Sequence, residues 1–459
     1  MPAPSSVTDA AVTVVGGARS GRAAAELLAA AGARVFLTDH GAPAADLPQR
    51  LAGAGIAYEF NGHTERALQA DFVVTSPGVP TQSPLLQSVL AHGLPLYSEI
   101  EVASWFCEAP IVAITGTNGK TTTTHLAGHL CATAFANTDR RVIVAGNVGT
   151  PFSDHARAAR ARDVVILEVS SFQLDHVDTF RPAVSVLLNI TPDHLDRYDG
   201  SVDAYAAAKL RLFARQSAGD VIVYNHDDAR IRPAAVAHAD AHGVRRLAFS
   251  QEQRRGAGMF VADGQLIVRD EGQETPLLPT DEVSLRGAHN LYNAQAAGLA
   301  GYALGLSPAA LRAGLTTFEG VRHRLELVRT LGDVQYVNDS KATNVEAVWY
   351  ALQSFERPIV LIAGGRDKGN AYERLQPLVR DRVRAVVAMG ESAATVQEEL
   401  GAHADACAHA TSMDDAVRRS RALAQPGDVV LLSPACSSFD MFENYEDRGQ
   451  HFRASVRAL

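Results

Sequence analysis

Short runs of apolar residues, rich in β-branched side chains, recur along the whole chain and alternate with helix-compatible stretches. In the first half they occupy 11–15, 34–38, 71–75, 111–115, 141–145, 163–169 and 183–189, and in the second half 220–225, 358–364, 384–390 and 428–433. Strands that are apolar on both faces and alternate with amphipathic helices are typical of parallel sheets covered on both sides. The sequence therefore predicts an α/β protein throughout.

The length of the chain and changes in its texture predict several domains. At about 150 residues per domain, the 459 residues suffice for about three domains. One boundary is expected near 98–108, just before an apolar strand, and another near 318–322, before a fresh strand. Between 245 and 285 the chain changes to short strand-like pieces, which predict a β-meander or insertion within the central domain.

Charge, cysteine usage and hydropathy exclude several classes of protein. The 42 Lys and Arg residues against 51 Asp and Glu give a formal net charge of −9 without a basic run, which argues against a nucleic-acid partner. The four cysteines are far apart and lack metal-ligand spacing, which predicts reduced thiols. The first residues lack the features of a secretory signal, and no stretch suits a membrane helix. We expect a soluble, cytoplasmic protein.

The segment IVAITGTNGKTTTT, residues 111–124, combines an apolar strand, a glycine-containing turn and a helix start. Gly116 and Gly119 let backbone N–H groups turn inward, Lys120 can neutralise phosphate oxygens, and the Thr121 hydroxyl can ligate Mg²⁺. The loop lacks the first glycine of the general phosphate-loop spacing. We expect a nucleoside triphosphate site; an ordinary strand–helix turn with a solvated lysine is the simpler alternative.

Polar residues follow two later apolar strands. Glu168 ends the first, and Asn189, Asp193 and His194 follow the second. Because ligands of open α/β sheets bind at the carboxyl ends of parallel strands, we expect these side chains to converge near the triphosphate. His194 is a candidate Mg²⁺ ligand or substrate contact, although a histidine after a strand is often only a surface residue.

Lys209, in DAYAAAKLRLF, lies on a predicted helix shortly after this loop. A solvated helix lysine is the ordinary interpretation. Beside two Mg²⁺ ions an ammonium group would be repelled, so a lysine there needs either distance or conversion to a neutral or anionic form.

The N-terminal segment AVTVVGGARSG, followed by FLTDH, predicts a strand, a glycine-rich turn, a helix and a second strand with an acid. Gly16, Ala18 and Gly21 stand in place of G-x-G-x-x-G, and Asp39 lies near the expected acidic position. Alone, this pattern would suggest an NAD-dependent dehydrogenase. Ala18, however, replaces the middle glycine that permits close approach of a pyrophosphate.

Ten motifs occur in a fixed order: TGTNGKTTT, GNVG, EVSSFQL, NITPDHLDRY, YAAAK, GAHNLYN, HRLE, NDSKATN, GGRDKG and SPACSSFDMFENYEDRG. In these motifs the chain resembles the Mur ligase family over its whole length. The resemblance implies an α/β fold with a Rossmann-like N-terminal domain for a UDP-sugar, a central P-loop-type ATPase domain with a mostly parallel sheet, and a Rossmann-like C-terminal domain for the amino acid. The expected ranges are 1–99, 100–320 and 321–459.

The blocks EVSSFQL, NDSKATN and SPACSSFDMF most resemble family members that add D-glutamate. The resemblance implies an ATP-dependent ligase that adds D-glutamate to UDP-N-acetylmuramoyl-L-alanine through an acyl phosphate, in peptidoglycan precursor synthesis. ATP and two Mg²⁺ ions are the implied cofactors, and we expect a monomer. Three alternatives stay open: a ligase for another amino acid, a folylpolyglutamate synthetase, and an ATP-driven switch without amide chemistry.

The resemblance also implies site residues. The implied catalytic residues are Lys120, Glu168, His194 and Lys209. The implied Mg²⁺ ligands are Thr121, Glu168, His194 and, if carbamylated, Lys209. The implied ATP contacts are Gly116, Thr117, Asn118, Gly119, Lys120, Thr121, Thr122, Asn290, Asn293, Arg324 and Asp339. The implied UDP-substrate contacts are Ala18, Arg19, Ser20, Asp39, Ser76, Gly78, Asn147, Ser170 and Gln173, with Arg19 and Ser20 near the uracil. The implied D-glutamate contacts are Thr343, Lys368, Ser438, Phe439 and Tyr445.

Overall fold

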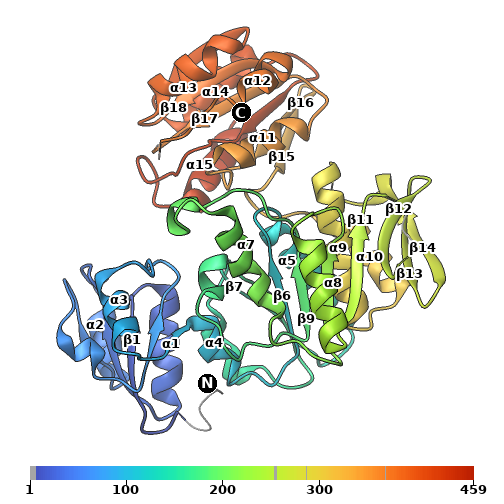
Figure 1. The fold of residues 1–459 in the computed structure, drawn as a ribbon. Helices are drawn as coiled ribbons and strands as arrows, with labels where there is room; N and C mark the ends of the chain where they lie inside the picture. The colour runs from blue at the N-terminus through green and yellow to red at the C-terminus, as the bar shows by residue number, and fades with distance from the viewer. Residues whose placement is uncertain (1–6, 253–255, 286, 367–368) are drawn as a thin grey trace. The chain divides into compact units, whose positions relative to one another are not determined.

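The computed structural model describes residues 7–252, 256–285, 287–366 and 369–459 (Figure 1). Within these residues the chain forms two compact units. The first unit comprises Met1–Ser284 and Asn290–Phe318, and the second comprises Leu285–His289 and Glu319–Leu459. Mostly parallel sheets with helices between their strands confirm the predicted α/β class. The division into three domains stays a prediction.

A parallel sheet of order β3-β2-β1-β4-β5 opens the first unit (blue in Figure 1). Its strands are β1 Ala11–Val15, β2 Arg34–Thr38, β3 Ala57–Glu59, β4 Phe72–Thr75 and β5 Leu96–Ser98. The helices around it are α1 Arg19–Ala30, α2 Leu47–Gly53, η1 Glu65–Leu68, α3 Pro84–Ala91 and α4 Glu99–Ser104. Successive residues of β4 enter different cores, Val74 with α1 and Val73 with α3, so helices cover both faces.

The second sheet of the first unit has the order β14-β13-β12-β11-β10-β9-β6-β8-β7. Its strands are β6 Ile111–Thr115, β7 Val142–Gly146, β8 Val164–Glu168, β9 Val184–Leu187, β10 Val221–Asn225, β11 Arg245–Ser250, β12 Gly258–Ala262, β13 Gln265–Asp270 and β14 Gln273–Pro279. Pairing is parallel from β7 to β12 and antiparallel from β12 to β14. The β12–β14 meander confirms the expected change of texture.

The helices of this part of the chain connect the strands. The α-helices are α5 Lys120–Phe135, α6 Ser171–Leu174, α7 Val202–Leu210, α8 Ile231–His242, α9 Ala288–Ala303 and α10 Pro308–Thr317. The 3₁₀ turns are η2 Phe152–Asp154, η3 Ala156–Ala158, η4 Leu195–Arg197, η5 Arg211–Phe213 and η6 Thr280–Glu282. In the described ranges, no helix is both long and apolar enough to cross a membrane.

The second unit contains a sheet of order β15-β16-β20-β17-β18-β19, in which only the β15–β16 pair is antiparallel among the described strands (orange to red in Figure 1). Its strands are β15 Glu326–Leu331, β16 Val334–Asn338, β17 Ile359–Gly364, β18 Val383–Met389, β19 Ala406–Ala410 and β20 Val429–Leu432. The helical segments are α11 Val345–Gln353, α12 Gln376–Arg382, α13 Ala393–Glu399, η7 Gly401–His403, α14 Met413–Leu423 and α15 Tyr445–Arg457.

The apolar runs form strands because their residues are buried on both sheet faces. Every residue of β6, β8 and β9 is buried, and these strands lie side by side in the interior of their sheet. All the strands expected from apolar runs are present, with ends shifted by at most two residues. The edge strands β3 and β19 were not predicted, because they are short and carry polar or small residues at half-exposed positions.

The buried carboxylate of Glu101, on α4, fixes the segment that precedes β9. Its oxygens accept hydrogen bonds from the backbone N–H groups of Asp178 (3.0 Å), Thr179 (2.9 Å) and Phe180 (2.8 Å). Trp105 Nε1 adds a further bond of 3.0 Å. A carboxylate that satisfies this many donors holds α4 firmly against the central sheet.

We expect Glu101→Gln to lower the free energy of unfolding of the first unit by about 2 kcal/mol, because an amide NH₂ would face backbone donors in place of a carboxylate oxygen. Calorimetric unfolding would measure the change. Glu108→Gln, at an exposed position nearby, should change it by less than about 0.5 kcal/mol. Equal effects of the two substitutions would contradict the role of Glu101.

Candidate active site

The loop between β6 and α5 requires both of its glycines. A Cβ on Gly116 would lie 2.8 Å from Leu188 Cβ. Gly119 has a positive φ of 83°, and a Cβ there would lie 2.2 Å from Asn293 Oδ1. The loop therefore packs too closely against α9 and against the residue that follows β9 to accept side chains at these positions.

The end of β9 holds the same loop in place. Asn118 N donates to Asn189 Oδ1 (2.8 Å), and Asn189 Nδ2 donates back to Asn118 O (3.1 Å). Thr117 N donates to Asn189 O (2.9 Å), while Thr117 Oγ1 donates to Thr191 O (3.0 Å). Sequence reasoning placed Asn189 at a strand end but missed this bracing role, because the pairing joins residues that are far apart in the chain.

Two lysine side chains meet at one carbonyl oxygen of the loop. Lys120 Nζ donates to Gly116 O (2.8 Å) and Thr117 O (2.7 Å), and Lys209 Nζ donates to Gly116 O (2.8 Å) from α7. Lys209 is only 1% exposed, so it is not the solvated helix lysine of the ordinary interpretation. Burial, followed by the charge of Lys120, holds the pKa of Lys209 well below its usual range.

Glu168 reaches the same sheet edge at the end of β8. Its side chain is buried, and Oε1 accepts a hydrogen bond from Asn147 Nδ2 (2.8 Å). Oε2 is buried and has no hydrogen-bond partner among the described residues. Because an unsatisfied buried acceptor costs about 1–3 kcal/mol, this oxygen suits a cation that arrives with a ligand.

His194 precedes η4 in a left-handed conformation, with φ 52°. Its ring packs edge-on against Phe172, with the centroids 5.1 Å apart, and Nε2 lies 3.6 Å from Asp193 Oδ2. Burial lowers the pKa of His194 even though Asp193 acts in the opposite direction. The imidazole is therefore neutral at neutral pH, which is the form that can bind a metal ion.

These side chains fit magnesium better than a metal held by protein groups alone. Within the ranges that the structure describes, no three His, Cys, Asp or Glu side chains gather to hold a metal ion. Mg²⁺ usually takes one or two carboxylates and completes its shell with water and substrate phosphates. The unpartnered oxygen of Glu168 and the hydroxyl of Thr121, in the first turn of α5, are donors of that kind.

Asn290 and Asn293, expected near the nucleotide, lie on α9 beside the loop. Asn293 Nδ2 donates to Asn290 Oδ1 (3.0 Å). Thr123 Oγ1, from the first turns of α5, donates to Asn293 Oδ1 (3.3 Å). Thr122 precedes it and is buried. The structure thus brings together α5 and α9 residues that are about 170 positions apart in the chain.

A cavity of about 460 Å³, named here the turn pocket, gathers nearly all of the residues expected to contact the UDP-substrate. The expected residues that line it are Ala18, Arg19, Ser20, Asp39, Ser76, Gly78, Asn147 and Gln173. Ser170 does not line it.

Ser170 and Gln173 form a capping box for α6, in which Gln173 N donates to Ser170 Oγ (3.3 Å) and Ser170 N donates to Gln173 Oε1 (3.0 Å). The spacing of Ser170 and Gln173, three residues apart at a helix start, is the sequence pattern that could have predicted this capping role.

The glycine-rich turn of the N-terminal sheet packs closely on itself and is supported by the side chain of Asp39. Gly16 has a φ of 101°, and a Cβ on Gly21 would lie 1.9 Å from Gly16 O. Asp39 accepts hydrogen bonds from the backbone N–H groups of Gly17 and Gly41. The acid that a dehydrogenase would use for a ribose therefore already supports the turn.

Asp339, at the end of β16, is the buried acid of the second unit. It is 1% exposed and accepts hydrogen bonds from Ser433 Oγ (2.9 Å) and Leu325 N (3.3 Å). Burial raises the pKa of Asp339 to about 6, against the opposing charge of Arg324. The electrostatic effect of Arg324 shows that these two expected nucleotide contacts lie near each other.

The described residues that are expected to bind D-glutamate lie in two segments of the second unit. Thr343 N donates to Lys341 O (2.9 Å), and Lys341 Nζ lies 5.4 Å from the ring centroid of Tyr445. Ser438 is buried, whereas Phe439 is 62% exposed. Lys368 lies outside the described residues.

Comparison with known proteins decides the family. Residues 114–301 match the Mur ligase middle domain, and residues 323–436 match the Mur ligase, glutamate ligase domain. The UDP-N-acetylmuramoylalanine–D-glutamate ligase of Salinibacter ruber is 59% identical over 457 residues, which cover 99% of each chain. The chain belongs to the Mur ligase family. The enzyme of the same name from Chlorobaculum parvum is 43% identical, again over 99% of each chain.

Solved structures of other Mur ligases share the fold at low sequence identity. UDP-N-acetylmuramate-alanine ligase MurC from Thermotoga maritima is 17% identical with a TM-score of 0.59, over 98% of this chain and 99% of its own. MurF from Acinetobacter baumannii is 18% identical with a TM-score of 0.58, over 94% of this chain and 86% of its own. The Mur ligase architecture is thus shared by proteins with few identical residues.

The buried carboxyl group of Asp339 makes stability depend on pH. Its pKa of about 6 in the folded chain exceeds the ordinary value of 3.8, so the unfolded chain loses this proton first as the pH rises. Wild-type stability should therefore fall between about pH 4 and about pH 7 relative to Asp339→Asn, by up to about 3 kcal/mol. Thermal unfolding across this range would measure the difference.

Asp333→Asn provides the matched control, because its side chain is largely exposed in the neighbouring β15–β16 turn. It should give a stability profile parallel to that of the wild type. Parallel profiles for Asp339→Asn as well would show that Asp339 does not titrate in this window.

Proposed function

We propose that this Mur ligase joins D-glutamate to UDP-N-acetylmuramoyl-L-alanine with hydrolysis of ATP, as a step in peptidoglycan precursor synthesis. The similarity along 99% of the chain to ligases named for this reaction carries the proposal. The phosphate loop with its two lysines and the buried Glu168 supports it. We further propose a cytoplasmic monomer with domains of 1–99 for the UDP-substrate, 100–320 for ATP and 321–459 for D-glutamate.

The central site would bind the triphosphate through the loop and the start of α5. Lys120, now bonded to loop carbonyls, would turn to phosphate oxygens, and the N-terminus of α5 would add favourable potential. The proposed ATP contacts are Gly116, Thr117, Asn118, Gly119, Lys120, Thr121, Thr122, Asn290, Asn293, Arg324 and Asp339.

Glu168 and Thr121 would hold one Mg²⁺, and His194 with a carbamylated Lys209 would hold a second. When bound, magnesium supplies positive charge that offsets the repulsion between two anionic reactants. The carbamate is supported by the crowding at Gly116 O, where Lys120 and Lys209 both donate. Conversion of the Lys209 ammonium to an anion removes the repulsion between the two lysines.

The reaction requires an activated carboxyl group, because a carboxylate is a poor electrophile. The alanyl carboxylate attacks the γ-phosphorus of ATP, the bond to ADP breaks, and an acyl phosphate forms. Lys120 stabilises the negative charge of this transition state. The unprotonated amine of D-glutamate then attacks the acyl carbon, and phosphate leaves the tetrahedral intermediate.

The substrate-binding residues follow the same proposal. The proposed UDP-substrate contacts are Ala18, Arg19, Ser20, Asp39, Ser76, Gly78, Asn147, Ser170 and Gln173. The proposed D-glutamate contacts are Thr343, Lys368, Ser438, Phe439 and Tyr445. Both sets contain backbone and hydroxyl donors that suit anionic groups.

Incubation of the purified chain with ATP, Mg²⁺, UDP-N-acetylmuramoyl-L-alanine and D-glutamate tests the activity directly. We expect ADP release to require both substrates and a new amide product to appear by mass spectrometry. L-glutamate and a folate acceptor serve as controls for the two related ligase activities. ADP release without an amide product would reject the ligase function in favour of an ATP-driven switch.

We expect Lys120→Ala to slow turnover by about 100- to 1000-fold, because a preorganised charge at the transition state is lost. Steady-state rates at saturating substrates would measure the effect. Arg312→Ala, which removes an exposed side chain on α10, should keep the wild-type rate. Near-normal turnover of Lys120→Ala would contradict its assignment to catalysis.

A further inference from the structure

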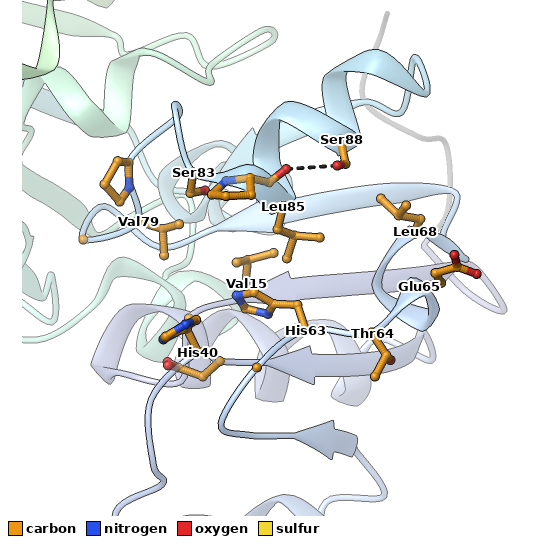
Figure 2. A pocket seen from close by; sticks show the side chains of 16 residues that line it. Val15, His40, His63, Thr64, Glu65, Leu68, Val79, Ser83, Leu85 and Ser88 are labelled. Carbon is orange, nitrogen blue, oxygen red and sulfur yellow. Dashed lines mark hydrogen bonds between the residues drawn. The ribbon is translucent and has the colours of Figure 1, made fainter.

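A second cavity, of about 710 Å³, adjoins the turn pocket and contains residues with no role so far (Figure 2). The two cavities share Gly16, Asp39, Gly78 and Val79. The apolar residues Val15, Leu68, Val79, Pro80, Pro84 and Leu85 line this cavity, named here the His63 pocket. An apolar cavity beside a diphosphate-sized site suits a flat nucleobase.

A chain of hydrogen bonds reaches this pocket from β3. Thr38 Oγ1, at the end of β2, lies 2.8 Å from Glu59 Oε1 and 2.7 Å from His63 Nδ1. Glu59 also accepts hydrogen bonds from Thr64 N (3.0 Å) and Thr64 Oγ1 (2.7 Å). Burial alone would raise the pKa of Glu59, but the bonds from Thr64 and Thr38 outweigh it and lower the pKa.

The direction of the bonds that join Thr38 to Glu59 and His63 follows from the single proton of the Thr38 hydroxyl. An ionised carboxylate can only accept, so the single hydroxyl proton of Thr38 points to Glu59. Thr38 Oγ1 must then accept from His63, which places a proton on Nδ1. Burial lowers the pKa of His63, so the ring is neutral at neutral pH. In that tautomer Nε2 carries no proton and is a hydrogen-bond acceptor.

Figure 2 shows the His63 ring among the side chains that line the pocket, with His40 beside it; their ring centroids are 6.1 Å apart. Asp39, the other acid at this edge, is already engaged by the backbone N–H groups of Gly17 and Gly41. His63 presents a further acceptor at this edge, and its proton state is set by its bond to Thr38, which in turn donates to Glu59.

We infer that His63 selects the nucleobase of the UDP-substrate by accepting a hydrogen bond at Nε2 from the imide N–H of uracil. This inference rests on the proposed function, since the UDP group is the ligand that it concerns. Cytosine has an unprotonated ring nitrogen at the same position, so two acceptors would face each other and repel. Thr38 and Glu59 act as positioning residues, because they hold the tautomer without touching the base.

Direct binding of free nucleotides to the full chain tests the inference independently of catalysis. By calorimetry, we expect the wild type to bind UDP about tenfold or more tightly than CDP and N3-methyl-UDP, as the loss of one hydrogen bond implies. His63→Phe should retain the ring shape but bind the three nucleotides with nearly equal affinity. Equal affinities in the wild type, or unchanged preference in His63→Phe, would overturn the assignment.

Thr38→Val isolates the positioning role, because it keeps the shape of the side chain and removes the hydroxyl that joins His63 to Glu59. We expect its preference for UDP over CDP to shrink towards that of His63→Phe. ¹⁵N NMR of the histidine ring should show an unprotonated Nε2 in the wild type and a mixture of tautomers in the variant. A wild-type spectrum with protonated Nε2 would overturn the mechanism.

Ser88→Ala is the matched control from the opposite wall of the pocket. Its hydroxyl already donates to Pro84 O (3.0 Å), so its loss should leave the preference for UDP unchanged. In the ligase assay, His63→Phe should raise the KM for the UDP-substrate and leave the KM values for ATP and D-glutamate unaltered. Absence of ligase activity in the wild type would reject the proposed function, whereas the nucleotide preferences would still decide the role of His63.

Discussion

Two lysine amino groups donate to the carbonyl oxygen of Gly116, and the chemistry of the central site depends on the charge that each of them carries. Lys120 and Lys209 each place Nζ 2.8 Å from that oxygen. Glu168, on the neighbouring strand, has a buried oxygen without a partner among the described residues. A metal-bound triphosphate would correct both imbalances, because it brings anionic oxygens to the lysines and a cation to the carboxylate. The lysines and the carboxylate therefore have the charges that would suit a metal-bound triphosphate.

The sequence predicted the fold and the general place of this site for one physical reason. Strands buried on both faces must be apolar throughout, so β6, β8 and β9 could be recognised, and parallel strands must end at the same edge. The contacts within the site could not be predicted in the same way. The bonds between Asn189 and Asn118 depend on how closely the β6–α5 loop approaches the residues after β9. The burial of Asp339 depends on how the elements of the second unit pack around it.

The glycine-rich turn shows how a familiar pattern can arise from packing. Gly21 is required because any Cβ would collide with Gly16 O, so this part of the pattern reflects packing of the helix on the turn. Ala18 has an ordinary φ of −71°, and its methyl group is therefore allowed at the position where a dinucleotide site needs glycine. Asp39 accepts hydrogen bonds from the backbone N–H groups of Gly17, in the turn, and of Gly41. The same strand–turn–helix unit can therefore support a pocket without the close pyrophosphate approach of NAD sites.

The role inferred for His63 could not be predicted from sequence patterns, for a different reason. A histidine in an exposed loop carries little information by itself, since its tautomer is set by its neighbours. Here those neighbours lie at the ends of two strands, Thr38 in β2 and Glu59 in β3. Selection between uracil and cytosine concerns the position of a single proton, so a fixed proton on Nδ1 is more discriminating than a charged side chain. The pairing of β2 with β3 therefore does more than complete the sheet: it sets which atom of His63 faces the ligand as an acceptor.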